Sequence, residues 1–256
     1  MTNVLVCIKR VPDSSGEVLL TEDAQAVDGR HVGFTISDHE NCAVEQAIQI
    51  ASSTGGEVCV LTVGPAEAAE QLRGALALGC HAATHVVAES AGLGPADVAR
   101  EIAAVVAAHE AEGRHHDLVL LGNDAADSGD FQVGIRLSYL LGRPVVTGIG
   151  VIEVDGDAIT ATSDGPAAQE VFEVPLPAVV TFLEGGVEPR YPTVSGRMKA
   201  KKIEIEERQP TTAAAGPKRI KLKVPPPVPS QVRVLGEGPS AADAVVALFA
   251  ELGVTR

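Results

Sequence analysis

Short, wholly apolar runs alternate with amphipathic segments along most of this chain, and this alternation constrains its fold more than any other feature. Runs such as 4–8 and 118–122 are typical of strands that are buried on both faces of a parallel sheet. The segment 40–51 has apolar side chains along one helical side. Strands that alternate with helices predict right-handed crossovers and a doubly wound, mainly parallel α/β sheet. The expected buried strands are 4–8, 58–63, 84–88, 118–122 and 176–182, and the expected helices are 40–51, 66–78, 95–110, 130–141 and 241–252.

A different pattern begins after the fourth of these helices. Residues 151–155, 158–162 and 169–174 are short runs separated by turn residues. We expect them to form a short antiparallel addition to the parallel sheet.

The last part of the chain is expected to be an extended arm before its helix. Residues 210–215 contain few apolar side chains, and the prolines within 223–229 exclude a helix and ladder hydrogen bonds there. A solvated tail would explain both stretches. An arm that packs against another surface, including that of a partner chain, is favoured by the alternating residues Ile203, Ile205, Ile220, Leu222 and Val224.

The charge of the chain excludes two classes of partner. A formal net charge of -14 argues against nonspecific binding of nucleic acid or of anionic membranes, and no long apolar run indicates membrane insertion. We interpret the four cysteines as buried thiols of a reducing compartment, because they lack C-x-x-C spacing and have mostly apolar neighbours. Since the N-terminus has no signal-peptide pattern, the expected location is the cytoplasm. The cysteines are Cys7, Cys42, Cys59 and Cys80.

The first candidate site is the loop from Gly122 to Gly134, which follows a predicted strand and leads into a predicted helix. Ligands of open α/β sheets gather at the carboxyl ends of strands, and a helix N-terminus offers N–H groups to a phosphate. Asp124, Asp127 and Asp130 oppose an anion, so we expect them to point away, to bond within the loop or to accept ribose hydroxyls. An ordinary surface loop and a divalent-cation site on the D-x-x-D-x-x-D pattern are the alternatives.

The remaining residues show no catalytic pattern. Lys9 and Arg10 follow the first predicted strand and could neutralise a phosphate, although surface ion pairs are the commoner role of such cations. The chain contains no G-x-G-x-x-G, P-loop or G-x-S-x-G motif. Its histidines are scattered without a zinc-binding spacing, so neither a metal site nor catalytic residues are expected.

A second candidate site is the stretch 188–202, where an apolar loop opens into a run of cations. An apolar tip such as Val194 could fill a pocket on another protein, and burying it is worth roughly 1.5–3 kcal/mol. That energy suits a weak, rapidly exchanging contact. The cations Arg197, Lys199, Lys201 and Lys202 would speed encounter with an acidic partner. The alternative is an amphipathic segment that folds onto its own domain.

Together these segments resemble the β-subunit of the electron transfer flavoproteins. The likeness covers about the first 205 residues in the right order, and its last blocks are the most specific. The matching segments are 4–12, 43–47, 118–122 with the loop after it, 132–134, 176–181, 188–191 and 198–202.

The resemblance implies an adenine-nucleotide α-hydrolase-like fold and a heterodimer with an α-subunit. In this family the α-subunit holds most of a redox FAD, the β-subunit covers one side of the flavin, and the β-subunit commonly buries an AMP with a structural role. The implied AMP site comprises, by position, Cys7, Ser37, Asp38, His39, Glu40, Val63, Gly122, Asn123, Asp124, Ala125, Ala126, Asp127, Ser128, Gly129, Asp130, Phe131, Gln132 and Val133.

The resemblance also implies transient docking on flavin dehydrogenases, such as acyl-CoA dehydrogenases. The implied docking residues are Tyr191, Val194, Met198 and Lys199. We therefore expect three parts, which are a nucleotide-binding α/β domain over 1–185, a docking segment with its basic stem over 186–202, and an arm and helix over 203–256 that pack on the partner subunit.

The chain departs from the family pattern at several of these positions. Val194 stands where the family usually has Leu, and Val133 stands where it usually has Thr, so a hydroxyl that could bond a phosphate is absent. Ser37–Asp38 replace a frequent Asn-Pro, and Ser14 and His39 replace aromatic residues near the flavin.

These departures leave two alternatives to a carrier that holds AMP. One is an electron-bifurcating flavoprotein that holds a second FAD in place of AMP. The other is a free-standing adenine-nucleotide sensor of the universal-stress type. An ATP-pyrophosphatase is disfavoured because no S-G-G-x-D-S loop follows the first strand.

Overall fold

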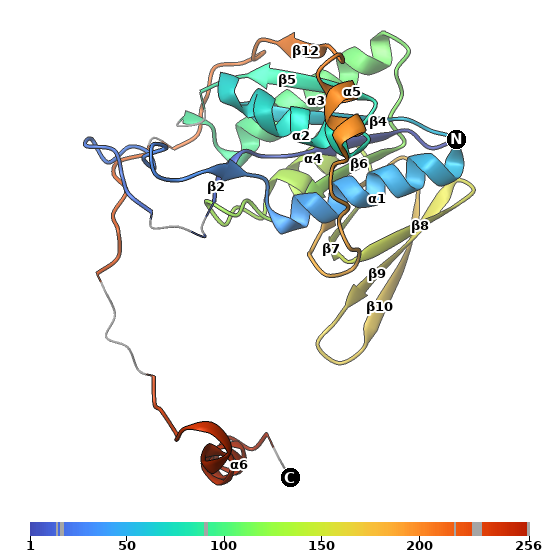
Figure 1. Ribbon diagram of the computed structural model, residues 1–256. Coiled ribbons are helices and arrows are strands. Elements are labelled where there is room, and N and C mark those ends of the chain that lie inside the picture. The colour runs from blue at the N-terminus through green and yellow to red at the C-terminus, as the bar shows by residue number, and fades with distance from the viewer. Residues whose placement is uncertain (14, 16–17, 90–91, 218, 227–231, 255–256) are drawn as a thin grey trace. The chain divides into compact units, whose positions relative to one another are not determined.

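A parallel sheet lies at the centre of the structure, a computed structural model that describes residues 1–13, 15, 18–89, 92–217, 219–226 and 232–254 (Figure 1). Within these residues the sheet has seven strands in the order β12-β5-β4-β1-β6-β11-β7, and every neighbouring pair is parallel. Its strands are β1 (Val4–Cys7), β4 (Val58–Gly64), β5 (Ala82–Val87), β6 (Leu118–Gly122), β7 (Val145–Ile149), β11 (Ala178–Phe182) and β12 (Ile205–Arg208).

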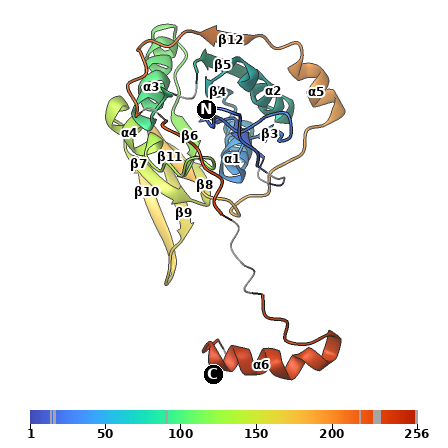
Figure 2. The same ribbon diagram turned by 90° about the vertical axis from the view of Figure 1, so that its left-hand side faces the viewer.

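Helices cover both faces of this sheet (Figure 2). Helices α1 (Asp38–Thr54), α2 (Ala69–Leu78) and α5 (Val194–Ala200) pack on one face, and α3 (Pro95–Ala111) and α4 (Val133–Leu141) pack on the other. Alternate residues of one strand serve the two cores, since Val4 and Val6 face α1 whereas Leu5 belongs to the core under α3. The predicted doubly wound parallel sheet is confirmed.

Smaller elements complete the body of the molecule. Strands β8 (Val151–Asp155), β9 (Ala158–Asp164) and β10 (Gln169–Pro175) form the predicted antiparallel addition, and β2 (Val11–Pro12) pairs with β3 (Phe34–Thr35). Two short 3-10 turns, η1 (Ala66–Ala68) and η3 (Gly238–Ala241), precede α2 and α6 (Ala242–Glu251). The predicted helix before the C-terminus is therefore present as α6.

Four features differ from the sequence-based expectation. Val194, expected in a loop, begins α5, because Thr193 accepts a hydrogen bond from the N–H of Gly196 and so caps a helix. Residues 205–208, expected in the arm, form the edge strand β12 beside β5. Strand β7 was not predicted, and α4 begins at Val133 rather than at residue 130.

The chain divides into two compact units, Met1–Lys223 and Val224–Arg256. In the first unit, residues after β12 are held on α3 rather than solvated. The buried carboxylate of Glu101 accepts hydrogen bonds from Thr211 and Thr212, and that of Asp97 accepts them from the N–H groups of Ala215 and Gly216. The proline stretch 223–229 lies partly outside the described residues.

The second unit contains η3 and α6. No side chain of α6 is buried, and those of Val246 and Phe249 are exposed. Among the described residues, no helix combines the length and the apolar character needed to cross a bilayer.

Candidate functional site

The carboxyl ends of β1 and β6 meet at the middle of the sheet. β1 and β6 are neighbours, and the chain leaves β1 toward α1 on one face while α4 follows β6 on the other face. In open α/β sheets such a switch in direction opens a crevice where ligands bind. The candidate loop 122–134 and the N-terminus of α1 both lie at this point.

Glu40 joins the end of β1 to the beginning of α1. Its carboxylate accepts hydrogen bonds from the N–H of Lys9 at 2.7 Å and from the N–H of Ser37 at 2.9 Å, while the Ser37 hydroxyl caps the helix. Burial raises the pKa of Glu40 to about 7, although the hydrogen bonds from Ser37 and Lys9 oppose this shift. Gly122 faces this residue, and a Cβ atom there would lie 3.0 Å from the Cγ of Glu40. The backbone of β6 and α1 is therefore closely packed at the crevice.

Two basic side chains from outside the loop contact two of the aspartates that oppose an anionic ligand. Lys9 Nζ donates to Asp127 Oδ1 at 2.5 Å. His39 Nδ1 lies 2.9 Å from Asp124 Oδ1, and its other ring nitrogen contacts Glu184. These two aspartates are thus paired outside the loop.

The third aspartate bonds within the loop. Asp130 accepts a hydrogen bond from the hydroxyl of Ser128 at 2.9 Å. This arrangement is one of those expected from the sequence. Among the described residues, no group of three or more His, Cys, Asp or Glu side chains is placed to hold a metal ion.

An open pocket of ≈ 460 Å³ adjoins the crevice. From the implied AMP site it includes Ser37, Asp38, His39, Asp124 and Ala126. The other residues that line it are Val11, Pro12, Asp13, Thr35, Ile36, Asn41 and Glu184.

The N-terminus of α4 fits a phosphate group. The side chain of Gln132, which precedes the helix, accepts hydrogen bonds from the Arg136 guanidinium and caps none of the first N–H groups. The loop before the helix turns at Gly129, whose φ is 66°. Ala125 and Ala126 have small side chains, so a ligand could approach the loop backbone closely. Because the nearby aspartates are paired or bonded within the loop, the residues present fit the phosphate of a ligand.

The other predicted nucleotide residues occupy two environments. Cys7 is buried in the core beneath α3, with Val63 packed partly against the same core. Val133 packs partly on that core too, whereas Phe131 is exposed before α4. Ser14, predicted near the flavin, lies outside the described residues.

Glu184 is a pocket-lining residue outside the predicted set that contacts a predicted site residue, His39. It follows β11, whose carboxyl end lies beside that of β6. The signal was present, because the buried strand 176–182 was predicted and the residues after such a strand reach the same edge of the sheet.

The docking segment presents three apolar side chains to solvent. Tyr191 is 90% exposed, Val194 81% and Met198 55%. Val194 and Met198 are four residues apart on one face of α5, and Tyr191 lies before the helix. Lys199 is exposed beside them, and the other cations of the segment are Arg197, Lys201 and Lys202.

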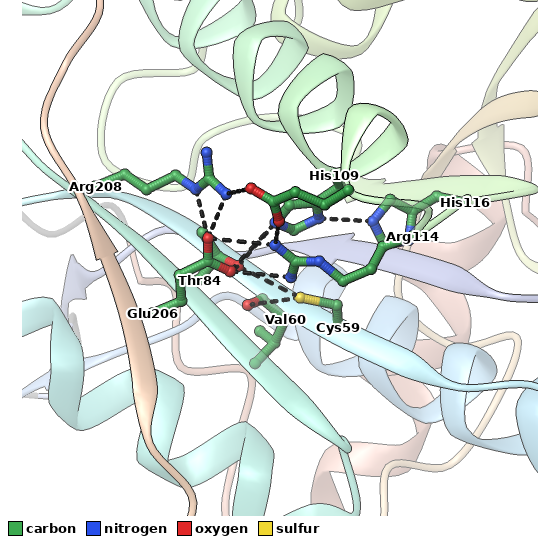
Figure 3. Close-up of polar contacts among 9 residues, drawn as sticks. Cys59, Val60, Thr84, His109, Arg114, His116, Glu206 and Arg208 are labelled. Atoms are coloured by element: carbon green, nitrogen blue, oxygen red, sulfur yellow. Dashed lines mark hydrogen bonds and ion pairs between the residues drawn. The ribbon is translucent and has the colours of Figure 1, made fainter.

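A second polar cluster joins β12 to the body of the molecule (Figure 3). Glu206 of β12 accepts a hydrogen bond from Arg114 at 2.9 Å, and His109 Nδ1 lies 2.8 Å from His116 Nε2. Although burial acts to raise the pKa of Glu206, hydrogen bonds from Arg114 and Arg208 hold it at about 2. Burial lowers the pKa of His116 to about 4, assisted by the charges of His109 and nearby arginines. The cluster fastens an edge strand and lies apart from the residues that line the crevice pocket.

A family model described as the electron transfer flavoprotein domain matches residues 26–213. The chain is similar to the electron transfer flavoprotein subunit beta of Syntrophomonas wolfei, with 33% identity over 236 residues that cover 91% of this chain and 90% of the relative. It is 36% identical to the Bacillus subtilis subunit beta over 80% of this chain and 78% of the relative. The human subunit beta is 35% identical over 81% of each chain.

Proposed function

This chain belongs to the electron transfer flavoprotein family, as a relative of its β-subunits, and from this membership we propose that it is the β-subunit of a heterodimeric electron carrier. It would assemble with an α-subunit and cover one side of an FAD that the α-subunit holds. FAD supplies the redox chemistry by taking up and releasing electrons. The residues of this chain orient the cofactor, exclude water and present a surface to electron donors.

The exposed apolar face of α5 carries the proposal of donor docking. Val194 is 81% exposed although a side chain of its kind is normally buried, and a run of cations follows it in the sequence. A partner with a small apolar pocket and an acidic rim matches both features. We propose flavin dehydrogenases, such as acyl-CoA dehydrogenases, as these partners.

Replacement of Val194 by Asp tests this docking. In the pair reconstituted with the α-subunit, we expect the KM for the carrier to rise at least about tenfold in an assay with a reduced acyl-CoA dehydrogenase, because a charge would enter an apolar pocket. Val171→Asp is the matched control, since Val171 is 60% exposed on β10. Undiminished transfer by Val194→Asp from every donor tested would refute the proposed function.

We propose a structural AMP in the crevice, supported by the uncapped N-terminus of α4 and the paired aspartates. Lys9 would hold Asp127, and His39 would hold Asp124, away from its phosphate. Mass spectrometry of nucleotides released by denaturing the purified pair is expected to detect AMP and a single FAD per heterodimer. Two FAD and no AMP would favour the bifurcating alternative, and an ATP-binding homodimer without flavin would favour the sensor.

The C-terminal unit and the location complete the proposal. The apolar side chains of α6, none of which is buried, suit a helix that packs on the α-subunit. We propose the cytoplasm as the location, because the four cysteines lie buried as free thiols, and free thiols persist in a reducing compartment.

A further inference from the structure

The docking segment is anchored to the body of the molecule at both ends although its outer face is exposed. Arg190 directly precedes Tyr191, the first exposed apolar residue of the docking segment. Its Nε and Nη2 donate to the two carboxylate oxygens of Glu45, each at 2.7 Å, and its backbone N–H donates to the same carboxylate at 3.2 Å. Glu45 lies on α1 with a side chain only 6% exposed.

The pair between Arg190 and Glu45 differs from an ordinary surface ion pair. It is bidentate, its acidic partner is nearly buried, and Gln49 Nε2 donates to that carboxylate as well, at 2.8 Å. Burial acts to raise the pKa of Glu45, but the hydrogen bonds from Arg190 and Gln49 bring it below its ordinary value. Bidentate pairs of this kind fix geometry as well as charge.

The rest of α5 is seated on α2. A Cβ atom on Gly196 would lie 2.3 Å from the carbonyl oxygen of Ala77, so only glycine allows the two helices to lie this close. At the other end of α5, Arg73 Nη1 donates to the carbonyl oxygens of Ala200, at 2.6 Å, and of Ile203. Arg73 of α2 thereby ties the last residue of α5 and the turn after it to α2.

We propose that Arg190 is a positioning residue for partner docking, whose pair with Glu45 holds Tyr191 and the first turn of α5 in the conformation that the partner binds. This inference rests on the proposed function of the docking face. A side chain that is already ordered loses less conformational entropy on binding, so a preformed face binds more tightly than a mobile one of the same composition. The partner has the chemistry stated above, an apolar pocket with an acidic rim.

Arg190 is the anchor to test, because it adjoins Tyr191 and does not belong to the hydrophobic core. The variants are Arg190→Gln, Glu45→Gln, the double variant and Arg190→Lys, which keeps the charge without the bidentate geometry. Arg30→Gln is the matched control, because it removes an ion pair with Asp28 outside the docking segment. All are prepared as the flavin-containing pair with the α-subunit.

The first measurement needs no electron donor. Hydrogen exchange of the peptide spanning 190–203 is followed by mass spectrometry. We expect exchange in Arg190→Gln to be about tenfold faster than in the wild type, with Arg30→Gln unchanged. The double variant is expected to match Arg190→Gln, since both remove the same pair. Exchange that stays at the wild-type rate overturns the positioning role.

The second measurement separates docking from electron transfer. With a reduced acyl-CoA dehydrogenase as donor, we expect Arg190→Gln to raise the KM for the carrier about tenfold while kcat and flavin content stay unchanged. Arg190→Lys should lie between it and the wild type. If Val194→Asp raises the KM but Arg190→Gln leaves it unchanged, the positioning role of Arg190 is overturned and the proposed function stands. If Val194→Asp has no effect, the proposed function fails, and the exchange measurement still decides whether Arg190 orders α5.

Discussion

At the scale of single residues, Glu40 is a buried carboxylate that connects two elements of the crevice. It accepts hydrogen bonds from the backbone N–H groups of Lys9 and Ser37, and burial raises its pKa to about 7. The folded chain therefore holds a proton on Glu40 that the unfolded chain releases above a pKa of 4.5. Because the folded pKa is the higher one, the stability contributed by this group is complete at low pH and is lost as the pH rises toward 7.

Replacement of Glu40 by Gln should remove this titration. Between about pH 4.5 and about pH 7.5 the free energy of unfolding of the wild type should fall by up to about 3 kcal/mol relative to that of the variant. Urea unfolding at several pH values measures the difference. Glu153→Gln, at an exposed position of β8, is the control. Parallel stability curves for wild type and Glu40→Gln would contradict the assignment.

At the scale of elements, β12 depends on a polar cluster rather than on a broad apolar face. Its residues Glu206 and Arg208 pair with Arg114 and Glu112, and the neighbouring His109 is completely buried (Figure 3). His109 and His116 share a hydrogen bond of 2.8 Å, which requires that at least one of the two rings is neutral.

Acid should weaken this cluster. The pKa of His116 is lowered from 6.5 to about 4, so the unfolded chain binds a proton that the folded chain excludes in that window. The contribution of His116 to stability is thus complete above about pH 6.5 and is lost as the pH falls through 4. The groups facing it are His109, Arg114, His115 and Arg143, and the charges of all four oppose its protonation.

His116→Gln tests this acid sensitivity. The stability advantage of the wild type over the variant should shrink by up to about 3 kcal/mol between about pH 6.5 and about pH 4. Exposed His31, changed to Gln, is the control. Titration of Glu40 changes the free energy of unfolding in the opposite direction over part of this pH range. The effect of His116 is therefore taken as the difference between wild type and His116→Gln at each pH. An advantage that does not vary with pH would show that His116 is not the titrating group.

At the scale of the whole molecule, the chain is acidic but has one segment that is rich in cations. The chain carries a formal net charge of -14, yet the docking segment concentrates cations beside its exposed apolar face. This arrangement suits an acidic partner that is steered to one place on an otherwise acidic surface. The second unit, residues 224–256, adds an apolar helix whose described side chains are not buried.

The sequence alone determined the local elements and the order in which they alternate. Buried strands such as 118–122 and helices such as 95–110 were predictable because hydrophobic period and turn residues are encoded within each segment. The short runs separated by turn residues likewise predicted the antiparallel strands β8, β9 and β10. The carboxyl-end rule then identified the loop after β6 as the candidate site, and the matching segments identified the family.

Tertiary structure alone decided which distant groups meet. The pairing of Lys9 with Asp127, of His39 with Glu184 and of Arg190 with Glu45 joins residues that are 118, 145 and 145 positions apart. Strand β12 likewise became part of the sheet only because β5 offers it a free edge and Arg114 a counter-charge. The physical reason is that charge partners and strand neighbours are chosen by proximity in three dimensions, which no local period encodes.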